Sequence, residues 1–188
     1  MKKSNLFKVL APILIVAFIL SANVVFKIST KEGTVSFIDG DLYPKVFLQD
    51  VAKARKSIKC AIYMFKLDMD DVNEFQKPIP AMAASLVNAS KRGIDTAIVM
   101  DLGRDDELTT KFNKITGKYL EDNGIKIVFD SPKQRLHTKM CVIDEKIIYI
   151  GSHNYTNSAM RYNSEVSTRI VSEELAKDAI KYLKQYGI

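Results

Sequence analysis

The hydrophobic and polar positions of the chain follow two periods after residue 30. Short apolar runs predict strands over residues 34–38, 57–65, 96–100, 126–129, 139–143, 147–150 and 166–170. Between these runs, apolar residues spaced three or four apart predict helices that begin near Pro44, Pro80 and Leu108. A last helix is predicted after Ser172, which suits an N-cap. The polar, acidic stretch 67–77 predicts a loop.

The order of these elements predicts the fold class. The first half alternates strands and helices, whereas the second half contains an antiparallel meander with a tight turn at residues 144–146 and then a helix. This arrangement predicts an α/β fold of the mixed α+β kind, with one mixed β-sheet flanked by helices.

The N-terminal residues differ from the rest. Residues 9–26 carry no charge, and as a helix they would extend about 27 Å, close to the roughly 30 Å of a bilayer core. Lys2 and Lys3 precede this span, as in a signal peptide or an uncleaved anchor, and Leu20 fits poorly at a cleavage site after Ala22. We expect an N-terminal hydrophobic helix in residues 1–29, as membrane anchor or signal peptide, and a catalytic domain in residues 30–188 located outside the cytoplasm. Contact with the membrane would run through residues 9–26 if they are retained.

Composition adds little about partners. The chain has 188 residues, 47% hydrophobic and 27% charged, which is typical of one globular domain. Its net charge is +6, and residues 27–188 hold 25 basic against 22 acidic residues. That excess is typical of an ordinary surface and does not by itself predict nucleic-acid binding.

The two cysteines, Cys60 and Cys141, lie in apolar runs and are too few for a metal site or a disulfide framework. We expect buried free thiols. A bridge stays open if the domain is exported and the two strands are neighbours.

The most informative pattern is H-x-K-x4-D-x6-G-S-x-N, which starts at His137. Alternation along a strand places His137 and Lys139 on one face, where one group can attack phosphorus while the other neutralises an oxygen. Asp144 falls at the hairpin turn, where aspartate is favoured, so we expect a structural role for it.

The second part of the pattern follows the hairpin. Gly151 permits a close turn of the backbone, and Ser152 and Asn154 can donate hydrogen bonds to phosphate oxygens. Gly-Ser-x-Asn is also common in ordinary turns, so this part gains weight only from its fixed distance to His137 and Lys139.

The whole pattern resembles the HKD motif of the phospholipase D superfamily. Its continuation through residues 155–165 is similar to the small single-motif bacterial endonucleases, and the resemblance covers roughly residues 34–188. It implies a phospholipase D/nuclease-like fold and a reaction that uses no metal or cofactor. It further implies roles for five residues: His137 as nucleophile, Lys139 and Asn154 as phosphate ligands, Ser152 as an assisting donor, and Glu165 as the carboxylate that orients the histidine.

The chain has only two histidines. A two-step reaction through a phosphohistidine needs a second group to protonate the leaving oxygen and then to activate water. His153 alternates with Ser152 and Asn154, so it should point away from their pocket. The remaining supplier is His137 of a second copy, and single-motif members of the superfamily are similar in pairing this way. We therefore expect a homodimer.

Basic and aromatic residues near the motif suggest the substrate. Arg135 is expected to bind substrate together with Lys139, Ser152 and Asn154, and further positive charge comes from Lys133 and Arg161. Tyr155 and Tyr162 could stack on exposed bases. The sequence thus predicts a metal-independent phosphodiesterase, an endonuclease of DNA with RNA left open.

Two alternatives remain at this point. One is a phospholipase D that hydrolyses phospholipid headgroups with the same histidine chemistry, which the N-terminal span keeps open. The other is a non-catalytic, membrane-tethered nucleic-acid binder, which is disfavoured because every motif position is intact.

Overall fold

The computed structural model describes residues 30–188. The expectations for residues 1–29, including the hydrophobic span 9–26, lie outside this range. In the described part of the chain, no helix combines the length and the apolar character needed to cross a membrane.

Seven strands form one mixed sheet in the order β1-β7-β6-β5-β2-β3-β4. Strands β2, β3 and β4 run parallel, and every other neighbouring pair is antiparallel. This confirms the predicted mixed sheet, with one difference: β1 lies at the far edge beside β7 and does not join the parallel strands. The strands are β1 (Thr34–Asp39), β2 (Ser57–Ile62), β3 (Asp95–Met100), β4 (Lys126–Phe129), β5 (Lys139–Ile143), β6 (Ile147–Gly151) and β7 (Val166–Val171).

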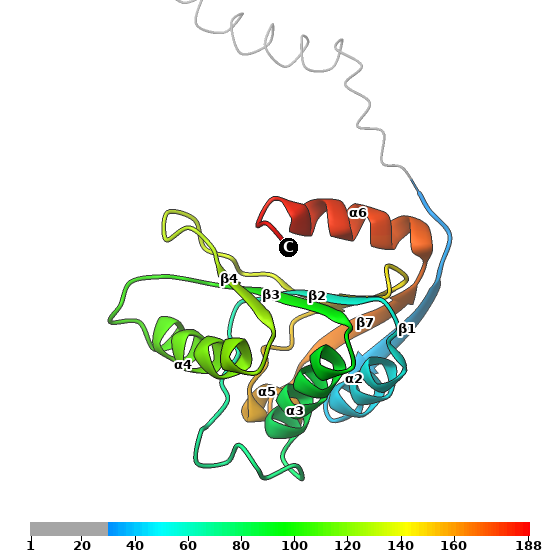
Figure 1. The fold of residues 1–188 in the computed structure, drawn as a ribbon. Helices are drawn as coiled ribbons and strands as arrows, with labels where there is room; N and C mark the ends of the chain where they lie inside the picture. The colour runs from blue at the N-terminus through cyan, green and yellow to red at the C-terminus, as the bar shows by residue number, and fades with distance from the viewer. Residues whose placement is uncertain (1–29) are drawn as a thin grey trace, which may run out of the picture. The chain divides into compact units, whose positions relative to one another are not determined.

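Helices cover both faces of the sheet. Helix α6 lies on one face, and α2, α3, α4 and α5 lie on the other (Figure 1). Ser172 caps α6 as predicted, because its hydroxyl accepts a hydrogen bond from the Leu175 N–H at 3.4 Å. The short helix α5 was not predicted. The helices are α2 (Leu42–Lys53), α3 (Pro78–Lys91), α4 (Leu108–Asp122), α5 (Asn157–Arg161) and α6 (Glu173–Lys184).

The sheet separates two hydrophobic clusters. The larger one packs α2 and α3 against the sheet and includes Phe47, Val51 and Leu86, all fully buried. The smaller one packs α6 against the opposite face and includes Val142 and Leu183. Each such side chain contributes about 1.5–3 kcal/mol by leaving water, so both helix layers are held firmly to the sheet.

Helix α4 packs differently from its sequence pattern. Leu108 and Ile115, which marked the helix in the sequence, are 66% and 49% exposed. Besides the apolar Leu120, three polar side chains of α4 are fully buried: Thr110, Asn113 and Thr116. These three side chains hydrogen-bond the backbone of residues 63–67, 101 and 103, whose buried polar groups need partners.

The cysteines correct an expectation. Cys60 and Cys141 are not free thiols, because they pair directly across β2 and β5 and form a disulfide. Both are fully buried, as predicted. Their pairing depends on β5 returning to lie beside β2, which the local pattern of each strand does not determine.

The disulfide gives a first prediction. Protein folded under oxidising conditions and then denatured without reductant should take up no iodoacetamide at Cys60 or Cys141, and two equivalents after reduction. Intact mass spectrometry measures the difference. Two labelled cysteines before reduction would show that the bond does not form.

A buried ion pair joins α2 to the sheet. Asp50, 8% exposed, accepts hydrogen bonds from Arg169 Nε at 2.6 Å and Nη2 at 3.1 Å, and from the hydroxyl of the buried Tyr149. Removing one partner of such a network leaves the others desolvated without compensation.

We therefore expect Asp50→Ala to lower the free energy of unfolding by about 2–4 kcal/mol, measured by urea denaturation. The matched control is Asp41→Ala, which removes an exposed pair with Lys45 at the start of the same helix and should leave stability unchanged. Equal effects of the two substitutions would contradict a special role for the Asp50 network.

Candidate active site

The motif residues gather at one edge of the sheet. Lys139 opens β5 and pairs with Ile62 at the end of β2, and Gly151 closes β6 opposite Ser167 near the start of β7. His137 therefore precedes β5 at the same edge where Ser152 and Asn154 leave β6 and Glu165 enters β7. Strand ends that meet at one edge bring together residues far apart in the chain.

His137 and Lys139 contact each other directly. Lys139 Nζ donates to the backbone oxygen of His137 at 2.9 Å, and the His137 side chain is exposed at the surface. Burial lowers the pKa of His137, and the positive charges of Lys139 and Arg135 lower it further, against a smaller opposing effect of Asp101. The imidazole is thus favoured in its neutral form, which a nucleophile requires.

Lys139 is half-buried, and this burial lowers the pKa of its ammonium. The carboxylates of Glu165 and Asp101 act in the opposite direction. The cation therefore lies within electrostatic reach of two acidic groups from different strand ends.

Tyr63, a residue that the sequence analysis did not identify, lies at the centre of the site. It follows β2, and its ring centroid is 4.5 Å from that of His137 and 4.7 Å from Lys139 Nζ. Its hydroxyl accepts a hydrogen bond from Arg135 Nη1 at 3.2 Å. No motif includes Tyr63. Its position at the end of a buried strand was the one feature of the sequence that could have indicated a role in the site.

Arg135 is already paired in the structure. Besides Tyr63, its guanidinium bonds Glu107 at 2.7 Å. An anionic substrate would have to share the guanidinium with Glu107 or displace the Glu107 carboxylate. The role of Arg135 in binding substrate therefore stays a prediction.

Ser152 and Glu165 form a second group in the site. Ser152 Oγ donates to Glu165 Oε2 at 2.5 Å, and Asn163 Nδ2 donates to Glu165 Oε1 at 3.1 Å. These are the side-chain partners of Glu165 within residues 30–188. The orientation of His137 by Glu165 therefore also stays a prediction.

Asn154 has an open hydrogen-bonding position. Its buried Oδ1 has no partner among the described residues. An unpaired buried amide costs about 1–3 kcal/mol, which a ligand could recover. A half-turn of the amide exchanges oxygen for nitrogen and would present a donor at the same place.

Asp144 and Gly151 shape the hairpin that carries the motif. The Asp144 carboxylate accepts backbone N–H groups of residues 55, 56 and 57 at 2.7–3.2 Å, and Asp144 and Glu145 both have φ of 54°, which a tight hairpin turn requires. A Cβ at Gly151 would overlap Ser167 on β7. The glycine thus permits the close approach of β6 to β7 directly before Ser152.

His153 points away from the motif, into the core. It is 1% exposed, its Nδ1 lies 2.8 Å from Ser167 Oγ, and its ring stacks on Tyr43 at 4.8 Å. Burial lowers its pKa. It therefore cannot reach a leaving group at the surface.

One aromatic expectation is wrong. Tyr155 is 1% exposed and its hydroxyl lies 3.1 Å from that of Tyr43, so it cannot stack on a base. Tyr162 is 79% exposed. Arg161 donates to the backbone oxygen of Gln76 at 2.5 Å.

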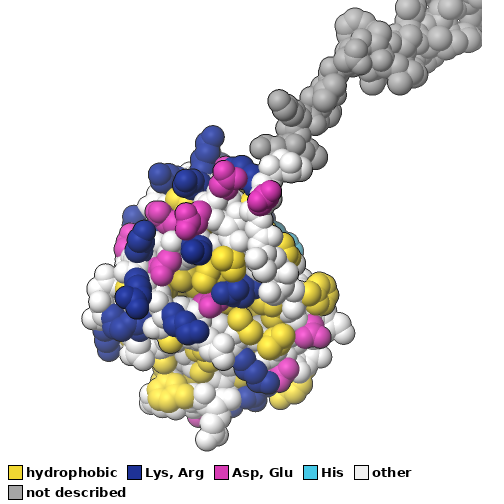
Figure 2. All heavy atoms as spheres, turned by 90° about the vertical axis from the view of Figure 1, so that its right-hand side faces the viewer, with side chains coloured by type: hydrophobic (Ala, Val, Ile, Leu, Met, Phe, Trp, Pro, Cys, Tyr) yellow, Lys and Arg dark blue, Asp and Glu magenta, His cyan; other side chains and the backbone are white. Residues whose placement is uncertain are grey.

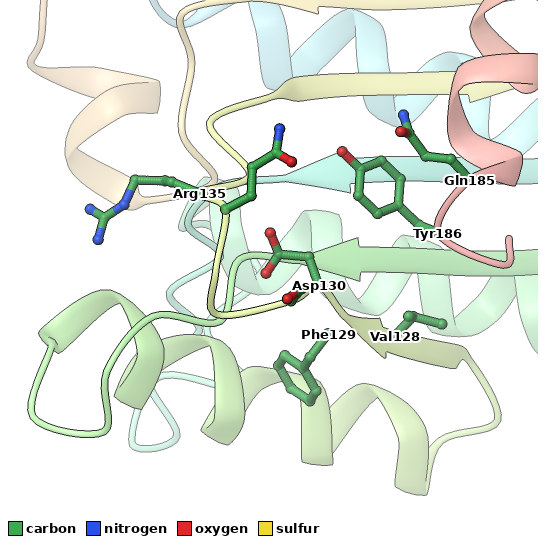
Figure 3. A pocket seen from close by; sticks show the side chains of 8 residues that line it. Val128, Phe129, Asp130, Arg135, Gln185 and Tyr186 are labelled. Carbon is green, nitrogen blue, oxygen red and sulfur yellow. The ribbon is translucent and has the colours of Figure 1, made fainter.

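A hollow of about 330 Å³ lies beside the end of β4 and the C-terminus of α6, and Arg135 is at its margin. Figure 3 shows the Arg135 guanidinium turned away from Tyr186 and Gln185. The side chains that line this hollow do not include those of His137, Lys139, Ser152 or Asn154. Residues 30–188 contain no cluster of three histidine, cysteine or acidic side chains that could hold a metal.

Comparisons with known proteins place this geometry in a family. The model of the family described as "Cardiolipin synthase, PLD-like domain" matches residues 47–186, so the chain belongs to the phospholipase D superfamily. This confirms the resemblance found in the motif.

The chain is also similar to individual members. It is 29% identical over 137 residues to a phospholipase D of Rickettsia prowazekii, a match that covers 73% of this chain and 58% of that protein. Among solved structures, the phospholipase D family member Nuc of Salmonella typhimurium has a TM-score of 0.68 at 24% identity, covering 82% and 94% of the two chains. NucT of Helicobacter pylori has a TM-score of 0.64 at 20% identity, covering 82% and 96%. These two structures share the fold.

The charges around His137 give a prediction that needs no substrate. Arg135→Gln removes a positive charge near the imidazole, so protonation becomes less unfavourable and the pKa of His137 should rise. The pKa of the buried His153 should not change and serves as the internal control. NMR titration of histidine-labelled protein resolves both, and an unchanged His137 would contradict the assigned electrostatics.

Proposed function

We propose that this protein is a phosphodiesterase of the phospholipase D superfamily that acts as an endonuclease on DNA, with RNA as the other possible polymer. The observation that carries the proposal is the exposed imidazole of His137, which is favoured in its neutral form and is flanked in the chain by the cations Arg135 and Lys139. Residues 131–143 hold three basic residues and no acid, which favours an anionic polymer. The fold shared with Nuc and NucT supports a nuclease.

His137 would act as the nucleophile. Its ring nitrogen forms a bond to phosphorus while the bond from phosphorus to the leaving oxygen breaks, and that oxygen takes a proton from an acid. Water then attacks the phosphohistidine, gives its proton to the same group, and releases the phosphate monoester. Lys139, with Asn154 and Ser152, would stabilise charge on the non-bridging oxygens.

The acid would be His137 of the partner subunit in a homodimer. An apolar strip beside the site supports this: Val35 and Phe37 on β1 are 61% and 71% exposed, and Ile150 and Val166 on β6 and β7 are 43% and 41% exposed. Cross-strand register puts these residues on one face of the sheet, the face of Met140, and Ser152 and Glu165 adjoin the ends of β6 and β7 in the chain. Figure 2 views the molecule from the side of β1 and α2 and shows hydrophobic side chains exposed among lysines and arginines. Burying the strip against a second copy would pair the two subunits through a self-complementary apolar surface.

We also propose that the domain works outside the cytoplasm, either anchored by residues 9–26 or released after their removal. The disulfide between Cys60 and Cys141 supports an oxidising compartment.

The alternative is phospholipid hydrolysis by the same chemistry, which the similarity to the Rickettsia phospholipase D favours. The full-length protein should be incubated with plasmid DNA and, separately, with phosphatidylcholine vesicles, both in EDTA. Nicking alone supports the nuclease, and lipid turnover alone overturns it in favour of the lipase. The absence of both activities would support a non-catalytic binder. We expect nicking that survives the chelator, because the side chains at the site supply nucleophile and charge.

We expect His137→Asn to lower the nicking rate by at least about 10³-fold without changing the circular dichroism spectrum, because it removes the nucleophile. Lys139→Met should also lower the rate, whereas Lys111→Met, at an exposed position on α4, is the matched control and should not. Full activity of His137→Asn would exclude the proposed nucleophile.

A further inference from the structure

Three groups of the site converge on one aromatic ring. The Tyr63 ring lies against the imidazole of His137, under the ammonium of Lys139, and 5.8 Å from the guanidinium carbon of Arg135. Cations are attracted to the negative face of an aromatic ring, and the effect strengthens where water is partly excluded. One side chain thus restrains the nucleophile and both of its neighbouring cations.

A carboxylate holds the same segment from another side. Asp101 follows β3 and is fully buried, and its Oδ1 accepts the Leu136 N–H at 2.8 Å. Leu136 is itself 2% exposed and directly precedes His137. Asp101 Oδ2 has no hydrogen-bond partner among the described residues.

Asn113 of α4 ties these two residues together. Its Nδ2 donates to the backbone oxygens of Tyr63 at 2.8 Å and Asp101 at 2.9 Å, and its Oδ1 accepts the Phe65 N–H at 2.9 Å. Tyr63 in turn donates its backbone N–H to the oxygen of Thr138 at 2.8 Å. The ends of β2 and β3 are therefore fixed to each other and to the segment 136–139.

We propose that Tyr63 and Asp101 are positioning residues that together set the orientation and the charge state of His137. The ring fixes the imidazole and the cations in place, and the carboxylate fixes the preceding backbone while supplying negative charge. The proposal goes beyond the HKD motif, which contains neither residue. Its kinetic consequence rests on the proposed function, whereas its spectroscopic consequence does not.

The groups that act on His137 come from three places in the fold. Lys139 and Arg135 flank it in the chain, Asp101 approaches from β3, and Tyr63 lies on it from β2. Glu107 faces Arg135, Glu165 faces Lys139, and Asp130 lies near Asp101. Of these acidic groups, Asp101 raises the pKa of His137.

Asp101→Asn tests the charge. An asparagine oxygen can still accept the Leu136 N–H, so the backbone contact is kept while the charge is lost. The pKa of His137 should then fall, because the protonated imidazole loses the favourable charge of Asp101. Asp130→Asn is the matched control: Asp130 caps Leu102 N–H at 2.7 Å in the next loop, and its substitution should leave the pKa of His137 unchanged. An unchanged His137 in a folded Asp101→Asn protein, judged by the signal of His153, would overturn the proposal for Asp101.

Tyr63→Leu and Tyr63→Phe test the ring. With bis(p-nitrophenyl) phosphate as substrate, the leucine variant should lose about 10–100-fold in kcat, because the nucleophile is no longer held, and the phenylalanine variant should lose less. Phe75→Leu, an exposed aromatic in the loop before α3, is the control and should not change the rate. The His137 NMR signals should move in the leucine variant and far less in the phenylalanine variant.

The outcomes distinguish a failure of the proposed phosphodiesterase function from a failure of the positioning roles. If the wild-type protein does not hydrolyse the phosphodiester at all, the proposed function fails, and the NMR signals of His137 still decide the positioning roles. If the wild-type protein is active and folded Tyr63→Leu keeps its kcat and its His137 signals, the positioning role of Tyr63 is overturned.

Discussion

The antiparallel pairing of β2 with β5 is the constraint on which the site depends. It sets Ile62 opposite Lys139, so that Tyr63 emerges from β2 against His137. A slip of one residue would turn Lys139 to the other face of the sheet. Two features hold this register: the disulfide between Cys60 and Cys141, and the Asp144 carboxylate bound to the backbone at the start of β2.

The polar inner face of α4 follows from the same constraint. Residues 63–67 continue past the end of β2 without a complete strand partner, so their buried backbone groups need other hydrogen bonds. An unpaired buried amide costs about 1–3 kcal/mol, comparable to what one buried apolar side chain contributes. Asn113 and Thr116 meet this need, and Asn113 also reaches Asp101. The helix therefore supports the site through these hydrogen bonds, in addition to the packing of Leu120 in the core.

The charge balance of the site is suited to an anionic ligand. Burial, Lys139 and Arg135 lower the pKa of His137 against the opposing charge of Asp101, and Glu165 and Asp101 raise the pKa of Lys139 against the effect of its burial. A bound phosphodiester would add a negative charge beside the cations and raise the pKa of the imidazole again. The free site thus favours a neutral imidazole at His137, which the proposed nucleophile requires, and a bound anion would favour protonation of the imidazole that is proposed as the acid.

Local patterning in the sequence was sufficient for the strands, the hairpin, the caps and the H-x-K…G-S-x-N spacing, because burial and turn geometry act over a few residues. The tertiary structure alone decided which strands are neighbours, and with that the place of β1, the disulfide across 81 residues, the exposed side of α4 and the burial of Tyr155. Tyr63 and Asp101 belong to the same group. Their importance comes from contacts with residues 35 or more positions away, and periodicity along one segment carries no information about such contacts.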